Sequence, residues 1–171
     1  QRTALQALEN AGVKIEVFAA DVSNAEEVTQ LLAHTSNLRG VVHAAGVLDD
    51  GMLMHQSPKR FLKVAGPKVS GAWNLHIQTK DLPLDFFVLF SSVASIIGSP
   101  GQSNYAAANA FMDGLAHHRK HQGLVATSIN WGPWSDVGMA ASDVVLQRLM
   151  KDGWQPMNAS QGCDFIGHLL K

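Results

Sequence analysis

The sequence predicts an α/β protein built around a doubly wound parallel sheet. Four short apolar runs, rich in Val, Ile and Phe and bounded by turn residues, are typical of strands buried on both faces. Stretches with helix-capping signals separate these runs, and this alternation is the pattern of parallel strands joined by helices. The strands are expected at residues 15–20, 41–45, 86–90 and 125–131.

The helices between these strands have recognisable ends. Ser23 and Glu26 have the spacing of a capping box, which predicts a helix through about residue 33. Ser57 followed by Pro58 is a second helix start, because proline fits the first turn of a helix. That helix should break at the Gly-Pro pair 66–67 and then resume. Further helices are expected at residues 2–11, 68–79, 143–151 and 160–170, with another that carries Tyr105 to about residue 122 and ends at Gly123.

Composition restricts the class of protein. The chain has 171 residues, of which 46% are apolar and 16% charged, with a formal net charge of −1, and this suits one soluble globular domain. Scattered basic residues argue against nucleic-acid binding, and the lack of a secretory signal or long apolar run argues against a membrane. The cytoplasm is therefore the expected location. Cys163 is the single cysteine, which excludes an internal disulfide, and it is expected in the core.

His117 and His121 lie four residues apart in a basic cluster at the end of a predicted helix. This spacing allows a metal site, but no carboxylate accompanies the two histidines in a zincin-like pattern. A solvated helix face is the preferred interpretation, so we expect no metal site.

Tyr105 is the only tyrosine in the chain. A free phenol has a pKa of about 10, so a nearby hydroxyl and a nearby cation must assist it in proton transfer near neutral pH. If either of the two residues before Tyr105 caps a helix, Tyr105 and Asn109 lie on one helix face. Ser91 and Ser92 both follow a buried strand, where an open α/β sheet presents groups to ligands. The alternative is a capped, alanine-rich helix that only packs against the sheet.

Three ordered motifs are more specific than these local patterns. They are Phe87-Val88-Leu89-Phe90-Ser91-Ser92, Gly98-Ser99-Pro100-Gly101-Gln102-Ser103-Asn104-Tyr105-Ala106-Ala107-Ala108-Asn109-Ala110 and Asn130-Trp131-Gly132-Pro133-Trp134. Together they resemble the ketoreductase domain of modular type I polyketide synthases, a member of the short-chain dehydrogenase/reductase superfamily with a Rossmann-like fold. The resemblance covers the chain from about residue 20 to its last residues. It implies NADPH-dependent reduction of a β-ketoacyl thioester on acyl carrier protein to a β-hydroxyacyl thioester.

The resemblance also implies a catalytic tetrad of Lys68, Ser92, Tyr105 and Asn109. Most short-chain dehydrogenases place a lysine four residues after the tyrosine. Here Asn109 occupies that position, and the lysine comes from a different helix, as it does in this family. Residue spacing alone does not choose Lys68 over Lys63 or Lys59, and the choice depends on the family match. Without that match, a solvated helix charge is the usual role of a lysine.

The tetrad suits the reduction of a ketone. A ketone that accepts hydride develops negative charge on its oxygen, so the site needs a donor that can also surrender a proton. Tyr105 would be this donor, and Ser92 would hold the carbonyl through a second hydrogen bond. The Lys68 cation would lower the pKa of the tyrosine, while Asn109 would orient Lys68 or a relay water.

Further cofactor contacts follow from the resemblance. Asp21 and Val22 would border the adenine of NADPH. The remaining cofactor contacts would be Ala44, Ala45, Gly46, Lys68, Tyr105, Pro133 and Trp134. Taken alone, Asp21 is better explained as a turn or helix cap. Trp131 and Trp134 could equally be core aromatic residues, which is the commoner role of tryptophan.

Leu48-Asp49-Asp50 matches the signature of B-type ketoreductases, which form the D-configured β-hydroxyl. Gln102 fits the same subtype, Ile97 replaces the A-type tryptophan, and Ala107 stands where epimerising members tend to have proline. The resemblance thus implies a non-epimerising B-type enzyme. Its substrate contacts would be Asp50, Ser91, Gln102 and Met139, the last in a lid-like segment. The bland alternative is that Asp49, Asp50 and Gly51 merely form a turn.

No G-x-G-x-x-G motif occurs in the chain, which begins with a predicted helix. The first strand and glycine-rich turn of a doubly wound fold are therefore missing, and residues 1–171 are expected to be the catalytic portion of a ketoreductase domain, truncated at its N-terminus. Its partners would be acyl carrier protein with a phosphopantetheine-linked β-ketoacyl chain and the neighbouring synthase domains. Two alternatives are a non-catalytic structural fragment of a synthase and a free-standing dehydrogenase of small alcohols, the latter disfavoured by Asn109.

Overall fold

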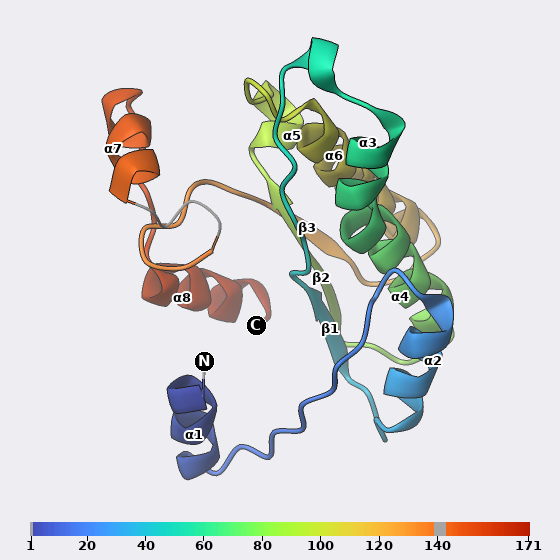
Figure 1. Ribbon diagram of the computed structural model, residues 1–171. Helices are drawn as coiled ribbons and strands as arrows, with labels where there is room; N and C mark the ends of the chain where they lie inside the picture. The colour runs from blue at the N-terminus through green and yellow to red at the C-terminus, as the bar shows by residue number, and fades with distance from the viewer. Residues whose placement is uncertain (1, 139–142) are drawn as a thin grey trace.

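The computed structural model describes residues 2–138 and 143–171. A three-stranded parallel sheet, ordered β1-β2-β3, lies at its centre between two layers of helices (Figure 1). The strands are β1 (Gly40–His43), β2 (Phe86–Ser92) and β3 (Thr127–Trp131). The helices are α1 (Arg2–Asn10), α2 (Ala25–Ala33), α3 (Pro58–Ala65), α4 (Gly71–Thr79), α5 (Ala94–Ile97), α6 (Ser103–His121), α7 (Asp143–Lys151) and α8 (Ala159–Leu169), with a 3₁₀ turn η1 (Leu53–His55) and a π-helical turn η2 (Gly66–Ser70). The predicted α/β class with a parallel sheet is confirmed.

Strand β2 lies between two apolar cores because its side chains alternate between the faces of the sheet. Phe87 and Leu89 belong to the core formed with α2, α4 and α6. Val88 packs on the opposite face with Trp131, where Ile166 of α8 covers it. The even-numbered and odd-numbered residues of β2 therefore face different surroundings. As a result, Ser91 and Ser92 at the end of β2 point to opposite faces of the sheet.

Residues 15–20 form no strand, and the prediction of a strand there is wrong. Within the described ranges, β1 pairs with β2 alone, so no strand accepts the backbone hydrogen bonds of residues 15–20. Their side chains are exposed except for the half-buried Ile15. An apolar run confers strand propensity, but a strand exists only when a neighbour completes its ladder. The other three predicted strands are present, with ends that shift by a few residues.

The start of α2 also differs from the prediction. Asn24, rather than Ser23, is its N-cap, and Asn24 Oδ1 accepts a hydrogen bond of 3.0 Å from the N–H group of Glu26. The Ser23 hydroxyl instead donates to the carboxylate of Asp21 over 2.7 Å. Both residue types cap helices well, so the choice between adjacent candidates depends on the backbone path before the helix.

Helix α6 begins after Gln102 without a side-chain cap, so neither Ser103 nor Asn104, the two candidates that the sequence offered, caps it. Asn104 is buried and instead donates from Nδ2 to the carbonyl of Asp49 over 2.8 Å. The end of the helix follows the prediction, since Gly123 lies just beyond it with a φ of +77°. Glycine adopts this left-handed conformation without the penalty that a side chain brings.

Cys163 is exposed on α8, so its expected place in the core is wrong. A lone cysteine with no disulfide partner has no local pattern that specifies burial. None of the helices in the described ranges is long and apolar enough to cross a membrane. The same ranges contain no cluster of three or more His, Cys, Asp or Glu side chains that could hold a metal ion.

Candidate active site

Lys68 is carried by the π-helical turn η2 between α3 and α4. Pro67 cannot donate the hydrogen bond that an α-helix needs, and the turn closes with a bond from the Gly71 N–H group to the Gly66 carbonyl, five residues back. Lys68 is only 3% exposed, and its Nζ donates to the Phe90 carbonyl of β2 over 3.1 Å. The break that the sequence predicts at residues 66–67 therefore coincides with a buried cation.

The ammonium group of Lys68 lies 5.2 Å from the centre of the Tyr105 ring. Tyr105 is half-buried in the first turn of α6. Burial raises the pKa of Tyr105, hydrogen bonding with Ser92 and Asn109 lowers it, and the charge of Asp50 raises it further. The structure therefore brings the four side chains of the expected tetrad together at the carboxyl end of β2.

The net effect on Tyr105 differs from the expectation. The resemblance implies that Lys68 lowers the pKa of Tyr105, whereas the pKa is raised in this structure because burial is the largest influence. The phenol therefore keeps its proton near neutral pH. The protonated phenol has a proton to donate, but its raised pKa makes it a weaker acid than a free phenol.

Burial lowers the pKa of Lys68 to about 8, and the nearby carboxylate of Asp113 acts in the opposite direction. Lys68 is therefore still mostly a cation at neutral pH. Among the described residues, the Phe90 carbonyl is the one hydrogen-bond acceptor of this ammonium group. An ammonium group has three N–H donors, so two remain for a ligand or a water.

Asn109 is fully buried one helical turn after Tyr105. Its Nδ2 donates to the backbone carbonyl of Tyr105 over 2.8 Å, whereas its Oδ1 has no hydrogen-bond partner among the described residues. Buried carbonyl oxygens nearly always have a partner. The unpaired Oδ1 thus provides an acceptor for a bound water or for the Lys68 ammonium group.

Ser91 does not join this site, although it was expected to contact substrate. It is 3% exposed, and its hydroxyl donates to the carbonyl of Asn109 over 3.2 Å and accepts from Asn130. Ser91 shares the face of β2 that packs against α6, whereas Ser92 lies on the opposite face. From their position in the sequence, Ser91 and Ser92 were equal candidates for a ligand contact. The alternation of side chains along β2 distinguishes them, because it directs them to opposite faces of the sheet.

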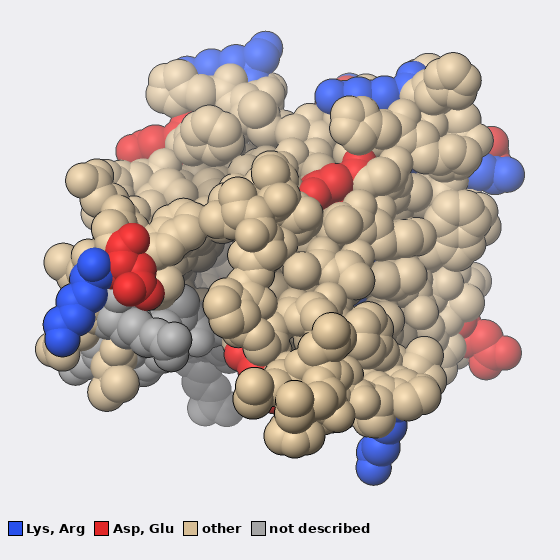
Figure 2. Space-filling model, turned by 90° about the horizontal axis from the view of Figure 1, so that it is seen from above, with Lys and Arg blue, Asp and Glu red and all other residues tan. Residues whose placement is uncertain are grey.

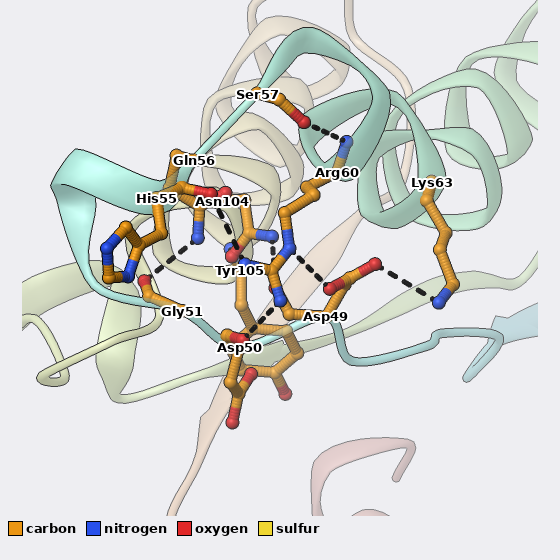
Figure 3. Close-up of polar contacts among 10 residues, drawn as sticks. All are labelled: Asp49, Asp50, Gly51, His55, Gln56, Ser57, Arg60, Lys63, Asn104 and Tyr105. Atoms are coloured by element: carbon orange, nitrogen blue, oxygen red, sulfur yellow. Dashed lines mark hydrogen bonds and ion pairs between the residues drawn. The ribbon is translucent and has the colours of Figure 1, made fainter.

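The side expected to receive substrate is bordered by Asp50 and Gln102. Gln102 Nε2 donates to Asp50 Oδ2 over 3.0 Å, and Asp50 is exposed beside Tyr105 (Figure 3). Seen from the end at which the strands terminate, most of the visible surface is uncharged (Figure 2).

Gly46 allows the segment after β1 to approach Lys68 closely. A Cβ atom at Gly46 would lie 2.9 Å from Cε of Lys68, so any larger residue would displace the lysine. Ala45 is half-buried and Ala44 exposed in the same segment. These small residues leave room beside Lys68, and its two remaining N–H donors can bind hydroxyl groups such as those of a ribose, so the site has the space and the donors that a nucleotide cofactor needs.

Asp21 lies in the turn before α2. Its carboxylate accepts hydrogen bonds from the N–H group and the hydroxyl of Ser23, and these bonds lower its pKa. Val22 is half-buried and packs beside Gly71. The turn-cap alternative for Asp21 is thus realised, while the exposed residue is still open to a ligand.

Trp134 packs against α8, where a Cβ atom at Gly162 would collide with its indole ring. The ring centres of Trp131 and Trp134 are 4.9 Å apart, so both indoles contribute to the second core. The carbonyl of Pro133 accepts a hydrogen bond from the N–H group of Met157. Trp134 therefore has the alternative role that the sequence allowed, that of a core aromatic residue. Met139, the other expected contact in this part of the chain, lies outside the described residues.

A partly buried polar network beside the site was missed by the sequence analysis. Asp113 of α6 accepts hydrogen bonds from Ser95 (2.6 Å), Ser128 (2.5 Å) and Asn130 (2.9 Å), which lie on α5 and β3. The network ties the end of β2 to α6 and places a carboxylate near Lys68. No local sequence signal marks this network, because an isolated Asp on a helix reads as a solvated charge.

His43 at the end of β1 makes stability sensitive to acid. Burial and the charge of Lys68 lower the pKa of His43 from 6.5 to about 4. Between these values the unfolded state binds more protons, so the free energy of unfolding falls as the pH drops from 6.5 towards 4, by about 3 kcal/mol in total. Denaturant unfolding at several pH values checks this, and the variant His43→Leu should lack this part of the acid sensitivity. An identical pH dependence in both proteins would contradict it.

Comparison with known proteins agrees with this geometry. The KR domain family matches residues 1–136. The phenolphthiocerol synthesis polyketide synthase type I Pks15/1 of Mycobacterium marinum is 46% identical over 170 residues, and the polyketide synthase GfsB of Streptomyces halstedii is 49% identical over 150 residues. These matches cover 95% and 86% of this chain but 8% and 3% of the two synthases.

Solved structures agree as well. The chain superposes on an A-type ketoreductase from a modular polyketide synthase with a TM-score of 0.93 and 39% identity, covering 98% of this chain and 36% of that one. It superposes on the first ketoreductase of the tylosin polyketide synthase with a TM-score of 0.83 and 40% identity, covering 94% of this chain and 35% of that one. The chain therefore belongs to the KR domain family, the ketoreductase domains of modular polyketide synthases.

Proposed function

We propose that residues 1–171 form the catalytic portion of an NADPH-dependent β-ketoacyl reductase. Its substrate would be a β-ketoacyl chain on the phosphopantetheine arm of acyl carrier protein, and its product the β-hydroxyacyl thioester. It would work in the cytoplasm beside the other domains of its synthase. The observation that carries the proposal is the buried Lys68 ammonium group, 5.2 Å from the Tyr105 ring, with Ser92 and Asn109 at the same phenol.

Each side chain of this cluster has a separate task. Tyr105, a phenol that is protonated near neutral pH, donates a proton to the ketone oxygen as charge develops there. Ser92 holds the same oxygen through a second hydrogen bond. The Lys68 cation stabilises the phenolate that remains. Asn109 offers its unpaired Oδ1 to a water that returns a proton to the site.

NADPH, when bound, supplies the hydride for the reduction. The residues that would hold it are the small segment Ala44, Ala45 and Gly46, with the two free Lys68 donors directed to a ribose. Asp21 and Val22 would border the adenine, and Pro133 and Trp134 the nicotinamide. Titration of NADPH into this chain, with cofactor fluorescence as the readout, tests this part, and comparison with a chain extended at its N-terminus shows how far these residues bind alone.

The catalytic proposal is tested with a reductase domain that contains this segment. Substrate-dependent oxidation of NADPH by a β-ketoacyl thioester is the expected result. A folded domain that binds NADPH but reduces no thioester would instead favour the non-catalytic alternative. That alternative has some support, because a relative from Mycobacterium tuberculosis, 46% identical over 170 residues, is named as a synthase thought to be inactive.

The product is expected to be the D-β-hydroxyacyl thioester, with an α-methyl centre left unepimerised. Leu48-Asp49-Asp50 and Gln102 border the side of Tyr105 on which the thioester would enter, so one face of the ketone would meet the hydride. Ala107 stands where epimerising family members tend to have proline, so we expect the configuration of the α-carbon to be left unchanged. Chiral chromatography of a reduced 2-methyl-3-ketoacyl thioester checks this, and a predominant L-β-hydroxyl would overturn the B-type assignment.

A further inference from the structure

The loop of residues 48–51 is attached to the start of the Tyr105 helix. Asn104 Nδ2 donates to the Asp49 carbonyl over 2.8 Å, and the Gly51 N–H group donates to the Gly101 carbonyl over 2.8 Å. The hydrogen bond between Gln102 and Asp50 is a third connection. Since α6 carries Tyr105, a displacement of this loop changes the space beside the phenol.

The opposite side of the loop is held by Arg60 of α3. Arg60 Nε donates to Asp49 Oδ1 over 2.7 Å, and Nη2 donates to the Asp50 carbonyl over 2.7 Å. Nη1 lies 3.3 Å from the His55 carbonyl, which belongs to η1. A planar guanidinium makes several directed bonds at once, which a flexible ammonium group does not. The Arg60 side chain thus connects α3 with Asp49, with Asp50 and with the turn η1.

The two aspartates of the loop point in different directions (Figure 3). The Asp49 carboxylate contacts Arg60 and, over 3.1 Å, Lys63. The Asp50 carboxylate lies on the side of Tyr105, where its charge raises the pKa of the phenol. Gly51 leaves room for the guanidinium, since a Cβ atom there would collide with Nη1 of Arg60. The contact between Arg60 and the loop therefore depends on a glycine at position 51.

We propose that Arg60 is a positioning residue, which acts through Asp49 and the Asp50 carbonyl to fix the loop of residues 48–51 and thereby the orientation in which the acyl thioester reaches Tyr105. This inference rests on the proposed reductase function. Asp49 would serve as the anchor of the loop and Asp50 as its substrate-facing group. Arg60 itself would touch neither cofactor nor substrate.

The test uses Arg60→Met in a reductase domain that contains this segment, because methionine keeps much of the volume and removes every donor. The KM for the acyl thioester should rise about tenfold, in line with the loss of charged hydrogen bonds. The minor β-hydroxyl stereoisomer should increase, while the Kd for NADPH stays within about twofold. Lys63→Met is the matched control, since Lys63 has a 58% exposed side chain and one contact with the same carboxylate, and it should change KM by less than about twofold.

Arg60→Lys is the second variant, because it keeps a cation near Asp49 but cannot reach both backbone carbonyls. It should have a KM and a product ratio between those of wild type and Arg60→Met. If Arg60→Met does not fold, as judged by circular dichroism, Arg60→Lys decides: a wild-type KM and product ratio overturn the proposal, and a raised KM with more minor isomer supports it.

Failure of this inference is distinct from failure of the proposed function. If the wild-type domain reduces the thioester and folded Arg60→Met matches it in KM and in product ratio, the role of Arg60 is refuted and the function stands. If the wild-type domain reduces nothing, both proposals fall together.

Discussion

Replacement of Tyr105 by phenylalanine is expected to lower kcat at least about 100-fold in a reductase domain that contains this segment. The change removes the proton donor while the ring that packs beside Lys68 remains. NADPH affinity should change little, because the phenyl ring fills the same space. Initial rates of NADPH oxidation, together with a cofactor binding titration, measure both quantities.

Ser92 and Ser91 provide a matched pair for this experiment. Ser92→Ala removes the hydroxyl that lowers the pKa of Tyr105 and is proposed to hold the ketone oxygen, so it should also lower kcat. Ser91→Ala alters a hydroxyl that faces α6 and should leave kcat near the wild-type value. Near-normal turnover by Tyr105→Phe would contradict the assignment of the proton donor. Equal losses in the two serine variants would contradict the orientation of β2.

Replacement of Lys68 by methionine is expected to lower kcat by a similar factor, about 100-fold, and to weaken NADPH binding. The variant keeps a buried side chain of similar length but removes the cation that stabilises the phenolate and the donors proposed for the ribose. Lys63→Met, which removes an exposed charge, is the control. Unchanged kcat and Kd in Lys68→Met would exclude Lys68 from the site.

Lys68 also predicts a pH dependence of stability. Its pKa falls from 10.5 in the unfolded chain to about 8 in the folded protein. Between these values the unfolded state binds more protons, so the stabilising contribution of neutral Lys68 grows as the pH rises, by about 3 kcal/mol in total. Below about pH 8 the buried group is charged and this contribution is absent. Lys68→Met should show no such rise.

The sequence predicted the parts of the fold that depend on local signals. The run from Phe86 is apolar, short and bounded by turn residues, and it forms the central strand β2. Gly123 ends α6 because a left-handed residue is needed there. Residues 15–20 have an equally good strand pattern, yet they form no strand, because strand formation depends on a neighbour that a local pattern cannot reveal.

The candidate site divides in the same way. The family motifs located Lys68, Ser92, Tyr105 and Asn109, and the structure brings these side chains together. The raised pKa of Tyr105 was not predicted, because it depends on how deeply the phenol is buried. Burial appears only when α6 is packed on the sheet.

Arg60 and Asp113 were missed for a related reason. On sequence grounds each reads as a solvated helix charge, the usual role of an isolated Arg or Asp. Their partners lie on other elements: Arg60 contacts the loop after β1, and Asp113 contacts α5 and β3. Contacts of this kind depend on tertiary structure, so only the coordinates reveal them.

The most direct test of the central claim is deuterium transfer from NADPH labelled at the hydride position of its nicotinamide. A reductase domain that contains this segment is incubated with this cofactor and a β-ketoacyl thioester, and the product is examined by mass spectrometry. The account predicts one deuterium on the β-carbon of the hydroxyacyl product in the wild-type protein, and almost none with Tyr105→Phe over the same time. Product without deuterium, or equal transfer by the two proteins, would contradict it.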